Sequence, residues 1–234
     1  MRKTKLLAFS LATRYSLLAT IIFCVLCIDL NAQEYTAPKR EFRGAWLSTV
    51  WAIDWPGNRD NTAAAEKSQK AQMIEILDRY KAANMNVCFF QVRGFSDAFY
   101  NSEYEPWSKY LCGERGKAPN YDPFQFVIEE CHKRGIECHA WINPYRANTN
   151  KKNKLTEDNR YYSNRYLYVS YGNQLLFNPG FPQNREHIIS VVKDIVSRYD
   201  IDALHMDDYF YPYPIHGLKF QDISNYKRYA EADG

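Results

Sequence analysis

The sequence lacks the short motifs that mark several large enzyme classes. It has no Gly-rich phosphate-binding turn after any predicted strand and no Gly-x-Ser-x-Gly elbow for a serine nucleophile. Beyond residue 32 it also has no Cys-x-x-Cys or His-x-x-x-His pair of the kind that binds zinc. We therefore expect neither a metal nor a cofactor.

An excess of positive charge is also missing once the first 32 residues are set aside. The chain holds 30 basic and 27 acidic residues, and four of the basic ones and one acidic one lie in residues 1–32, so 26 of each remain. A balanced charge without a basic stripe gives no support for a nucleic-acid partner. Aromatic residues, by contrast, make up 16% of the chain, with 19 Tyr, which indicates a surface that stacks on flat ligands.

Residues 1–32 have the features of a secretory signal peptide. They combine a basic start, an apolar stretch over residues 17–26 and a small-residue exit at Asn31-Ala32. The stretch is short and soon followed by Asp29, so cleavage is favoured over an uncleaved anchor, and Leu26 disfavours a lipid on Cys27. We expect export to the periplasm, the cell envelope or the medium, with no membrane span after cleavage. A linker over residues 33–40 and one domain over residues 41–234 follow.

Strand and helix patterns alternate along the predicted domain. Apolar, β-prone segments predict strands at residues 42–50, 86–92, 136–142 and 202–207, and helical periodicity predicts helices at 64–83, 123–134 and 185–199. Asp122 is expected to cap the second helix, with Gln125 completing a capping box and Gly135 ending it. In the third helix five residues are expected to face inward: Ile188, Ile189, Val192, Ile195 and Val196.

The lengths of the connections indicate a (β/α)8 barrel. Each helix-to-strand link is a few residues long, whereas each strand-to-helix link is long, including about forty residues after residue 142. Long loops at the carboxyl ends of parallel strands are typical of TIM barrels, and a doubly wound sheet is the competing interpretation. Only the first four of eight strand-helix units are visible, with a further helix starting near residues 225–230, so the domain looks incomplete at its C-terminal end.

The four cysteines beyond the leader are Cys88, Cys112, Cys131 and Cys138, and three of them lie in apolar strand or helix patterns. Such positions predict buried free thiols. The spacing leaves open a disulfide between Cys131 and Cys138.

Alternation along the strands places polar and aromatic residues on the barrel axis. In the fourth strand Ala203, His205 and Asp207 share one face, while Leu204 and Met206 share the other. Aromatic rings and polar groups together are what sugars require. We therefore expect these residues to bind substrate: Arg43, Trp46, Gln91, Arg93, His139, Trp141, Asn143, Tyr145, Arg146, His205, Tyr209 and Tyr211.

Asp207 and Asp208 are the predicted catalytic residues. Two adjacent acids beside aromatic residues repel each other, which can prepare one of them to act as a general acid. The structural alternative is that one aspartate caps the following loop while the other pairs with an arginine.

Several long motifs resemble the glycosyl-hydrolase-like family 10 domain. They are the segments 42–46 (FRGAW), 90–94 (FQVRG), 140–146 (AWINPYR), 178–180 (NPG) and 205–212 (HMDDYFYP). The resemblance covers nearly all of the chain beyond the leader but only the front part of the family's domain. It implies a (β/α)8 barrel, export, and hydrolysis of a glycan, with peptidoglycan strands that lack peptide stems as one substrate. The family's Asp-Asp-Tyr motif falls on Asp207, Asp208 and Tyr209.

These observations lead to a secreted glycoside hydrolase that acts on a polysaccharide by carboxylate acid/base catalysis. A metal-dependent polysaccharide deacetylase is one alternative, because an aspartate pair at a strand end can serve a metal and a base. A non-catalytic glycan-binding protein is the other.

Overall fold

The computed structural model describes residues 41–148, 150, 152, 155–156 and 160–230. The predicted signal peptide and linker lie outside the described residues. The chain divides into two units, Met1–Glu41 and Phe42–Gly234, and the description below concerns the second. Among the helices described, none has the length and apolar character needed to cross a bilayer.

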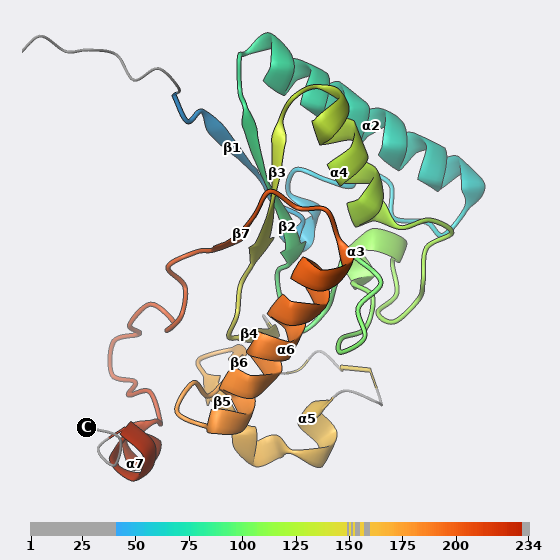
Figure 1. The fold of residues 1–234 in the computed structure, drawn as a ribbon. Helices are drawn as coiled ribbons and strands as arrows, with labels where there is room; N and C mark the ends of the chain where they lie inside the picture. Colours follow the sequence, from blue (N-terminus) through green and yellow to red (C-terminus); the bar gives the residue numbers. More distant parts are fainter. Residues whose placement is uncertain (1–40, 149, 151, 153–154, 157–159, 231–234) are drawn as a thin grey trace, which may run out of the picture. The chain divides into compact units, whose positions relative to one another are not determined.

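Four parallel strands form the central sheet, in the order β1, β2, β3, β7 (Figure 1). Their bounds are β1 Gly44–Leu47, β2 Val87–Arg93, β3 Glu137–Ile142 and β7 Ala203–Met206. All four were predicted, although the first is shorter than expected. The predicted α/β fold with a parallel sheet is thus confirmed, and the carboxyl ends of the strands meet at one edge.

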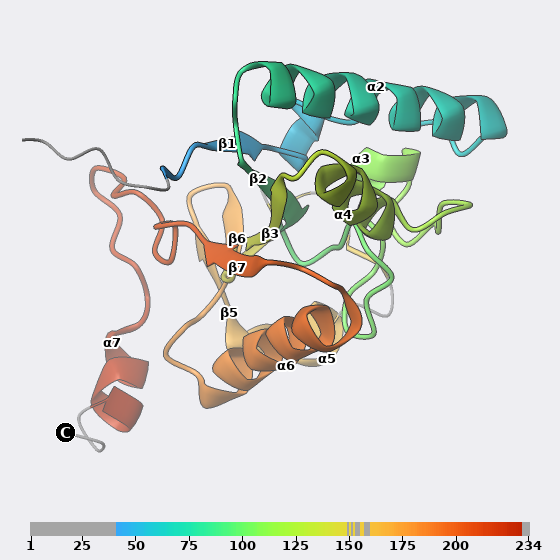
Figure 2. The same ribbon diagram turned by 45° about the horizontal axis from the view of Figure 1, so that its top comes forward.

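Three long helices lie on one side of this sheet (Figures 1 and 2). They are α2 Ala63–Ala82, α4 Pro123–Lys133 and α6 Pro182–Arg198. The third begins earlier than predicted, at a proline, which is favoured in the first helical turn. The shorter helical segments are η1 Val50–Ala52, α3 Lys109–Cys112, α5 Arg160–Ser163, η2 Arg165–Leu167, α7 Ile223–Asn225 and η3 Tyr226–Ala230.

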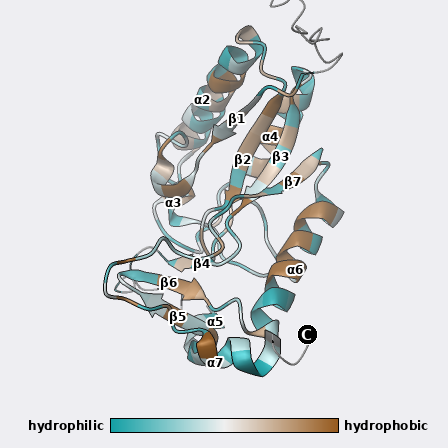
Figure 3. Cartoon of the chain, turned by 90° about the vertical axis from the view of Figure 1, so that its left-hand side faces the viewer, coloured by the Kyte–Doolittle hydropathy of each residue, from teal (hydrophilic) through white to brown (hydrophobic). Residues whose placement is uncertain are grey.

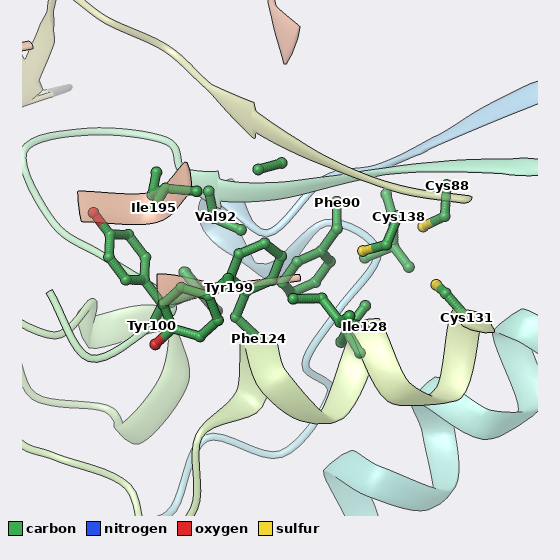
Figure 4. Packing of buried hydrophobic residues seen from close by; sticks show 14 of the residues in the cluster. Cys88, Phe90, Val92, Tyr100, Phe124, Ile128, Cys131, Cys138, Ile195 and Tyr199 are labelled. Atoms are coloured by element: carbon green, nitrogen blue, oxygen red, sulfur yellow. The ribbon is translucent and has the colours of Figure 1, made fainter. Parts of the chain in front are cut away.

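The main hydrophobic core lies between the sheet and these three helices. Phe90 of β2 stacks on Phe124 of α4 with ring centroids 5.9 Å apart, and Tyr199 lies 4.9 Å from Phe124 (Figure 4). Cys88 and Cys138 from adjacent strands lie beside Cys131 of α4 in the same core (Figure 4). All four cysteines beyond the leader are buried free thiols, as predicted.

The inward face of α6 was only partly predicted. Ile188 and Ile195 are buried, but Ile189 and Val196 are 51% and 52% exposed, and the fully buried Val191 was missed. The buried stripe is narrower than the apolar pattern, because β-branched residues also occupy the solvent side. Figure 3 shows hydrophobic and hydrophilic residues mixed along this helix.

The long connection between β3 and α6 contains a second sheet that the sequence did not predict. Its antiparallel strands are β4 Arg146–Asn148, β5 Tyr168–Tyr171 and β6 Gln174–Phe177, in the order β4, β6, β5. Gly172, at φ +57°, turns the chain between the last two strands. The sheet has a small apolar cluster of its own, formed by Ala147, Leu155, Leu175 and Phe177.

Asp122 caps α4 as predicted. Its Oδ1 accepts hydrogen bonds from the backbone N–H groups of Phe124 and Gln125, at 3.0 and 3.1 Å. The predicted capping box does not form, because the Gln125 side chain donates to Glu129 instead. The second carboxylate oxygen of Asp122 accepts a hydrogen bond from the Tyr199 hydroxyl at 2.5 Å, which ties the start of α4 to the end of α6.

We expect Asp122→Ala to lower the free energy of unfolding by about 1–2 kcal/mol, because two backbone donors of α4 lose their acceptor. Urea denaturation at neutral pH measures the change. The matched control is Asp200→Ala, which removes an exposed aspartate. A loss of the same size in both variants would count against the cap.

Candidate active site

The side of the sheet that faces away from the helices carries a cluster of rings. The Trp46 ring lies 5.1 Å from that of Trp141 and 5.3 Å from that of His205, and Phe89 lies 4.7 Å from His205. These four residues, the aromatic floor, alternate with residues such as Leu47 and Phe90 that belong to the core. Trp46 is 53% exposed whereas Trp141 is buried, so among the described residues the floor meets solvent mainly at Trp46.

Asp207 lies at the carboxyl end of β7, next to the floor. Its Oδ2 accepts a hydrogen bond from the Asn143 amide, and its Oδ1 accepts one from the Tyr209 backbone N–H at 3.3 Å. The loop-capping alternative therefore holds for Asp207, yet the same carboxylate faces β3. Asp207 is half-buried and Asp208 is exposed, and neither forms an ion pair with an arginine within the described ranges.

Gln91 and Asn143 support Asp207 from inside the protein. Both side chains have no exposed surface, and Gln91 Nε2 donates to Asn143 Oδ1 at 2.6 Å. The sequence predicted that both contact substrate. In the structure their side chains pair with protein groups and lie beneath the carboxylate.

Arg93 is also buried, and its guanidinium forms hydrogen bonds with the main chain just after β3. Its Nη1 donates to the main-chain oxygens of Asn143 and Pro144, and its Nε and Nη2 donate to the two carboxylate oxygens of Glu105, both at 2.6 Å. His187 Nε2 lies 3.1 Å from Glu105 Oε1. Burial alone would raise the pKa of Glu105, but the Arg93 charge and the His187 hydrogen bond hold it at about 2.

Two polar ring atoms of the floor have no hydrogen-bond partner among the residues that the structure describes. They are Nε1 of Trp141 and Nε2 of His205, both buried. Burial lowers the pKa of His205, although the nearby Asp207 acts in the opposite direction. An unpaired buried polar atom costs free energy, so these two ring nitrogens are polar groups of the floor that remain unsatisfied among the described residues.

Four further predicted residues lie in the segments after β3 and β7. The Arg146 guanidinium is 3.8 Å from the centroid of the Tyr209 ring, whose hydroxyl donates to Gln174 Oε1 at 3.0 Å. The Tyr145 ring lies 6.3 Å from that of Phe210. Burial and Asp222, which accepts the Tyr211 hydroxyl at 2.9 Å, raise the pKa of Tyr211 to about 12.

Two predicted residues are not brought to this edge. Arg43 precedes β1, at the amino end of the sheet, and its Nε donates to the main-chain oxygen of Asn84 at 2.6 Å. His139 lies nearer the middle of β3, with its Nε2 3.1 Å from Glu137 Oε2. The segment 42–46 that contains Arg43 therefore begins before β1 and ends at Trp46 in the aromatic floor.

Some supporting groups were not predicted. The backbone N–H groups of Thr49 and Val50 donate to Gln91 Oε1, and Glu105 pairs with Arg93. Backbone donors leave no trace in a sequence pattern. Glu105 lies in a long irregular connection where no periodicity marks a buried acid.

Two cavities border this region. One of about 280 Å³ is lined by Tyr211, Asp222 and Arg185 together with Pro179 and Gly180 of the Asn-Pro-Gly motif. Another of about 430 Å³ lies beside Glu105 and His187. The described part of the chain contains no group of three or more His, Cys, Asp or Glu residues placed to hold a metal ion.

Comparison with known proteins identifies the family. The family Glycosyl hydrolase-like 10 matches residues 41–234. The chain belongs to this family. Glycosyl hydrolase YngK of Bacillus subtilis (strain 168) is 42% identical over 216 residues, which are 92% of this chain and 42% of YngK. Glycosyl hydrolase DigH of Escherichia coli (strain K12) is 37% identical over 204 residues, which are 81% of this chain and 46% of DigH.

This member of the glycosyl hydrolase-like 10 family thus spans less than half the length of either relative. Among solved structures, a maltogenic α-amylase from Thermotoga neapolitana is similar over 82% of this chain and 43% of its own, with a TM-score of 0.46 and 12% identity. A similarity of this degree says nothing about the chemistry.

We expect Glu105→Gln to lower the free energy of unfolding by about 3–5 kcal/mol at pH 7, because Arg93 stays buried without its counter-charge. The depressed pKa means that the pair stabilises the fold above the usual carboxyl value of 4.5, and that this contribution is lost as pH falls towards about 2. Denaturant titrations from pH 7 to pH 3 should therefore show that the difference in the free energy of unfolding between wild type and variant becomes smaller as the pH falls.

The control for this experiment is Glu75→Gln, which breaks an exposed pair with Arg79. It should change the stability by less than about 1 kcal/mol at any pH. If the loss of unfolding free energy in Glu105→Gln stays constant down to pH 3, the stabilising role of the Arg93–Glu105 pair is contradicted.

Proposed function

We propose that this chain supplies four strands of a (β/α)8 barrel glycoside hydrolase that cleaves a polysaccharide, with Asp207 and Asp208 as its catalytic carboxylates. The observation that carries the proposal is the position of Asp207. It lies at the carboxyl edge of the sheet, held by Asn143, beside the aromatic floor. Function in a barrel of this kind is built at that edge.

The sheet supports a barrel rather than a doubly wound fold. Its strands are neighbours in chain order and its three long helices lie on one side (Figure 2). A doubly wound sheet reverses its strand order and carries helices on both faces. Within the described chain, β1 and β7 each pair on one side only, so further parallel strands can close the barrel over the floor.

The residues around Asp207 suit a glycan. Ring faces of sugars pack on indole and imidazole rings such as those of Trp46, Trp141 and His205, while sugar hydroxyls need the polar atoms placed among them. Tyr145, Arg146, Tyr209 and Tyr211 would flank the bound chain. The resemblance to the family makes peptidoglycan strands without peptide stems the first substrate to test.

The two carboxylates have different surroundings. Asp207 accepts hydrogen bonds at both oxygens, which orients it as a base or nucleophile, whereas Asp208 is exposed and is assigned the role of general acid at the leaving oxygen. Retaining hydrolysis needs two carboxyl groups about 5 Å apart, and inverting hydrolysis needs a wider gap. Export to the periplasm, envelope or medium belongs to the same proposal, because such glycans lie outside the cytoplasm.

We expect Asp207→Asn and Asp208→Asn each to lower cleavage of isolated peptidoglycan glycan strands by about 10²–10⁴-fold. The whole natural protein is assayed for new reducing ends, and circular dichroism checks that each variant folds. Asp200→Asn is the control and should keep full activity.

Full cleavage by both variants would refute the carboxylate assignment. Binding of the strands without new reducing ends in the wild type would favour a non-catalytic glycan-binding protein. Release of acetate, dependent on a divalent ion, would favour the deacetylase.

A further inference from the structure

Gln91 occupies a position where the orientation of its amide is fixed by the protein. The oxygen and nitrogen of a glutamine amide have nearly the same size and shape, so surroundings must decide which is which. Oε1 of Gln91 lies 3.0 Å from the Thr49 backbone nitrogen and 2.9 Å from that of Val50. A backbone N–H group can only donate, so the atom that faces both must be the amide oxygen.

This choice decides the orientation of the next amide. With Oε1 turned towards the chain after β1, Nε2 of Gln91 points at Asn143, 2.6 Å from the nearer amide atom. Because Nε2 donates, that atom must be Oδ1 of Asn143. Nδ2 of Asn143 is then left to face Asp207 Oδ2, to which it donates.

The hydrogen bonds therefore run in one direction, from Gln91 of β2 to Asn143 after β3, and from Asn143 to Asp207 after β7. Both amides are fully buried, so water cannot offer either of them an alternative partner. The main chain of Asn143 is fixed as well, by its N–H bond to the Arg93 oxygen at 2.8 Å and by the Arg93 guanidinium on its own oxygen.

We propose that Gln91 is a positioning residue: it sets the direction of the Asn143 amide, so that an N–H group rather than an oxygen meets the carboxylate of Asp207. The inference rests on the proposed function only for the role of Asp207 in hydrolysis. The hydrogen bonds from Gln91 to Asn143 and from Asn143 to Asp207 do not depend on that role. Among the described residues, the titratable and charged groups near Asp207 include His205 of β7, the neighbouring Asp208, and Arg93, which is bound to the Asn143 main chain.

Gln91→Glu tests the direction of these hydrogen bonds. A glutamate at position 91 has two acceptor oxygens when ionised, so either the Asn143 amide turns, or the new carboxyl group keeps a proton and donates it in a hydrogen bond to Asn143 Oδ1. If the amide turns, its oxygen meets Asp207 Oδ2, and the two acceptors need a proton between them. In both cases the three side chains of the variant hold one proton, and they take it up at a pH about one unit or more above the pH at which the single wild-type carboxyl group among them, that of Asp207, titrates.

The measurement is the ¹³C carboxyl shift followed by NMR from pH 3 to pH 8, on the whole chain. Ser48→Ala is the matched control, because the Ser48 hydroxyl also donates to Gln91 Oε1, at 3.0 Å, but the two backbone donors still fix its direction. This control should leave the titration unchanged. Equal titrations in wild type and Gln91→Glu, or an equal shift in both variants, would overturn the proposal.

A measurement on the wild type covers the case in which Gln91→Glu does not fold. Scalar couplings across hydrogen bonds should connect Gln91 Nε2 with the Asn143 carboxamide carbon, and Asn143 Nδ2 with the Asp207 carboxyl carbon. The absence of both couplings would also overturn the proposal.

Activity separates this inference from the proposed function. If the protein hydrolyses glycans, Gln91→Glu should move the acidic limb of the pH profile of kcat to higher pH and lower kcat more than it raises KM. If the protein hydrolyses nothing while both couplings are present, the proposed function fails and the positioning role of Gln91 stands. Hydrolysis without the couplings would support the proposed function and overturn the positioning role.

Discussion

The pairing of β2 with β3 at their carboxyl ends is the constraint on which the site depends. Arg93 accepts the backbone N–H of Asn143 at 2.8 Å and returns its guanidinium to the main-chain oxygen of the same residue. Asn143, which follows β3, is thereby fixed from two directions, and its side chain donates a hydrogen bond to Asp207 at the end of β7. A shift of one residue in this register would turn Asn143 towards the helices and leave Asp207 without its amide partner.

The parts of the fold that repeat were predictable from the sequence. A strand buried on both faces, followed by a helix with an apolar stripe, leaves a periodic trace, and parallel pairing then brings strand ends together. That reasoning was sufficient to expect Asp207 near Asn143, because both end strands whose alternation points inward. It failed where burial departs from hydrophobicity, as at Ile189 and Val196, which are apolar yet half exposed.

The chemistry of the candidate site was less predictable, because it depends on which polar atom pairs with which. The sequence gives no indication that Arg93 pairs with Glu105, a residue twelve positions away in an irregular connection. It gives none that backbone groups after β1 orient Gln91 either. Residue type predicted that Gln91, Arg93 and Asn143 lie at strand ends, as they do, but not that their side chains form hydrogen bonds with other protein groups there.

The two sides of the sheet are stabilised in different ways: one by apolar packing and the other by hydrogen bonds. The side that faces the helices is packed with apolar side chains. Among them are Cys88, Cys131 and Cys138, because a buried free thiol behaves as a small apolar group. On the side that faces away from the helices, the buried side chains of Gln91, Asn143 and Arg93 form hydrogen bonds with protein groups. The floor remains unsatisfied, with two unpaired ring nitrogens and an exposed indole at Trp46. A protein retains such a surface when something polar and flat, or a further strand, lies against it, because otherwise the desolvated nitrogens and the exposed rings both cost free energy.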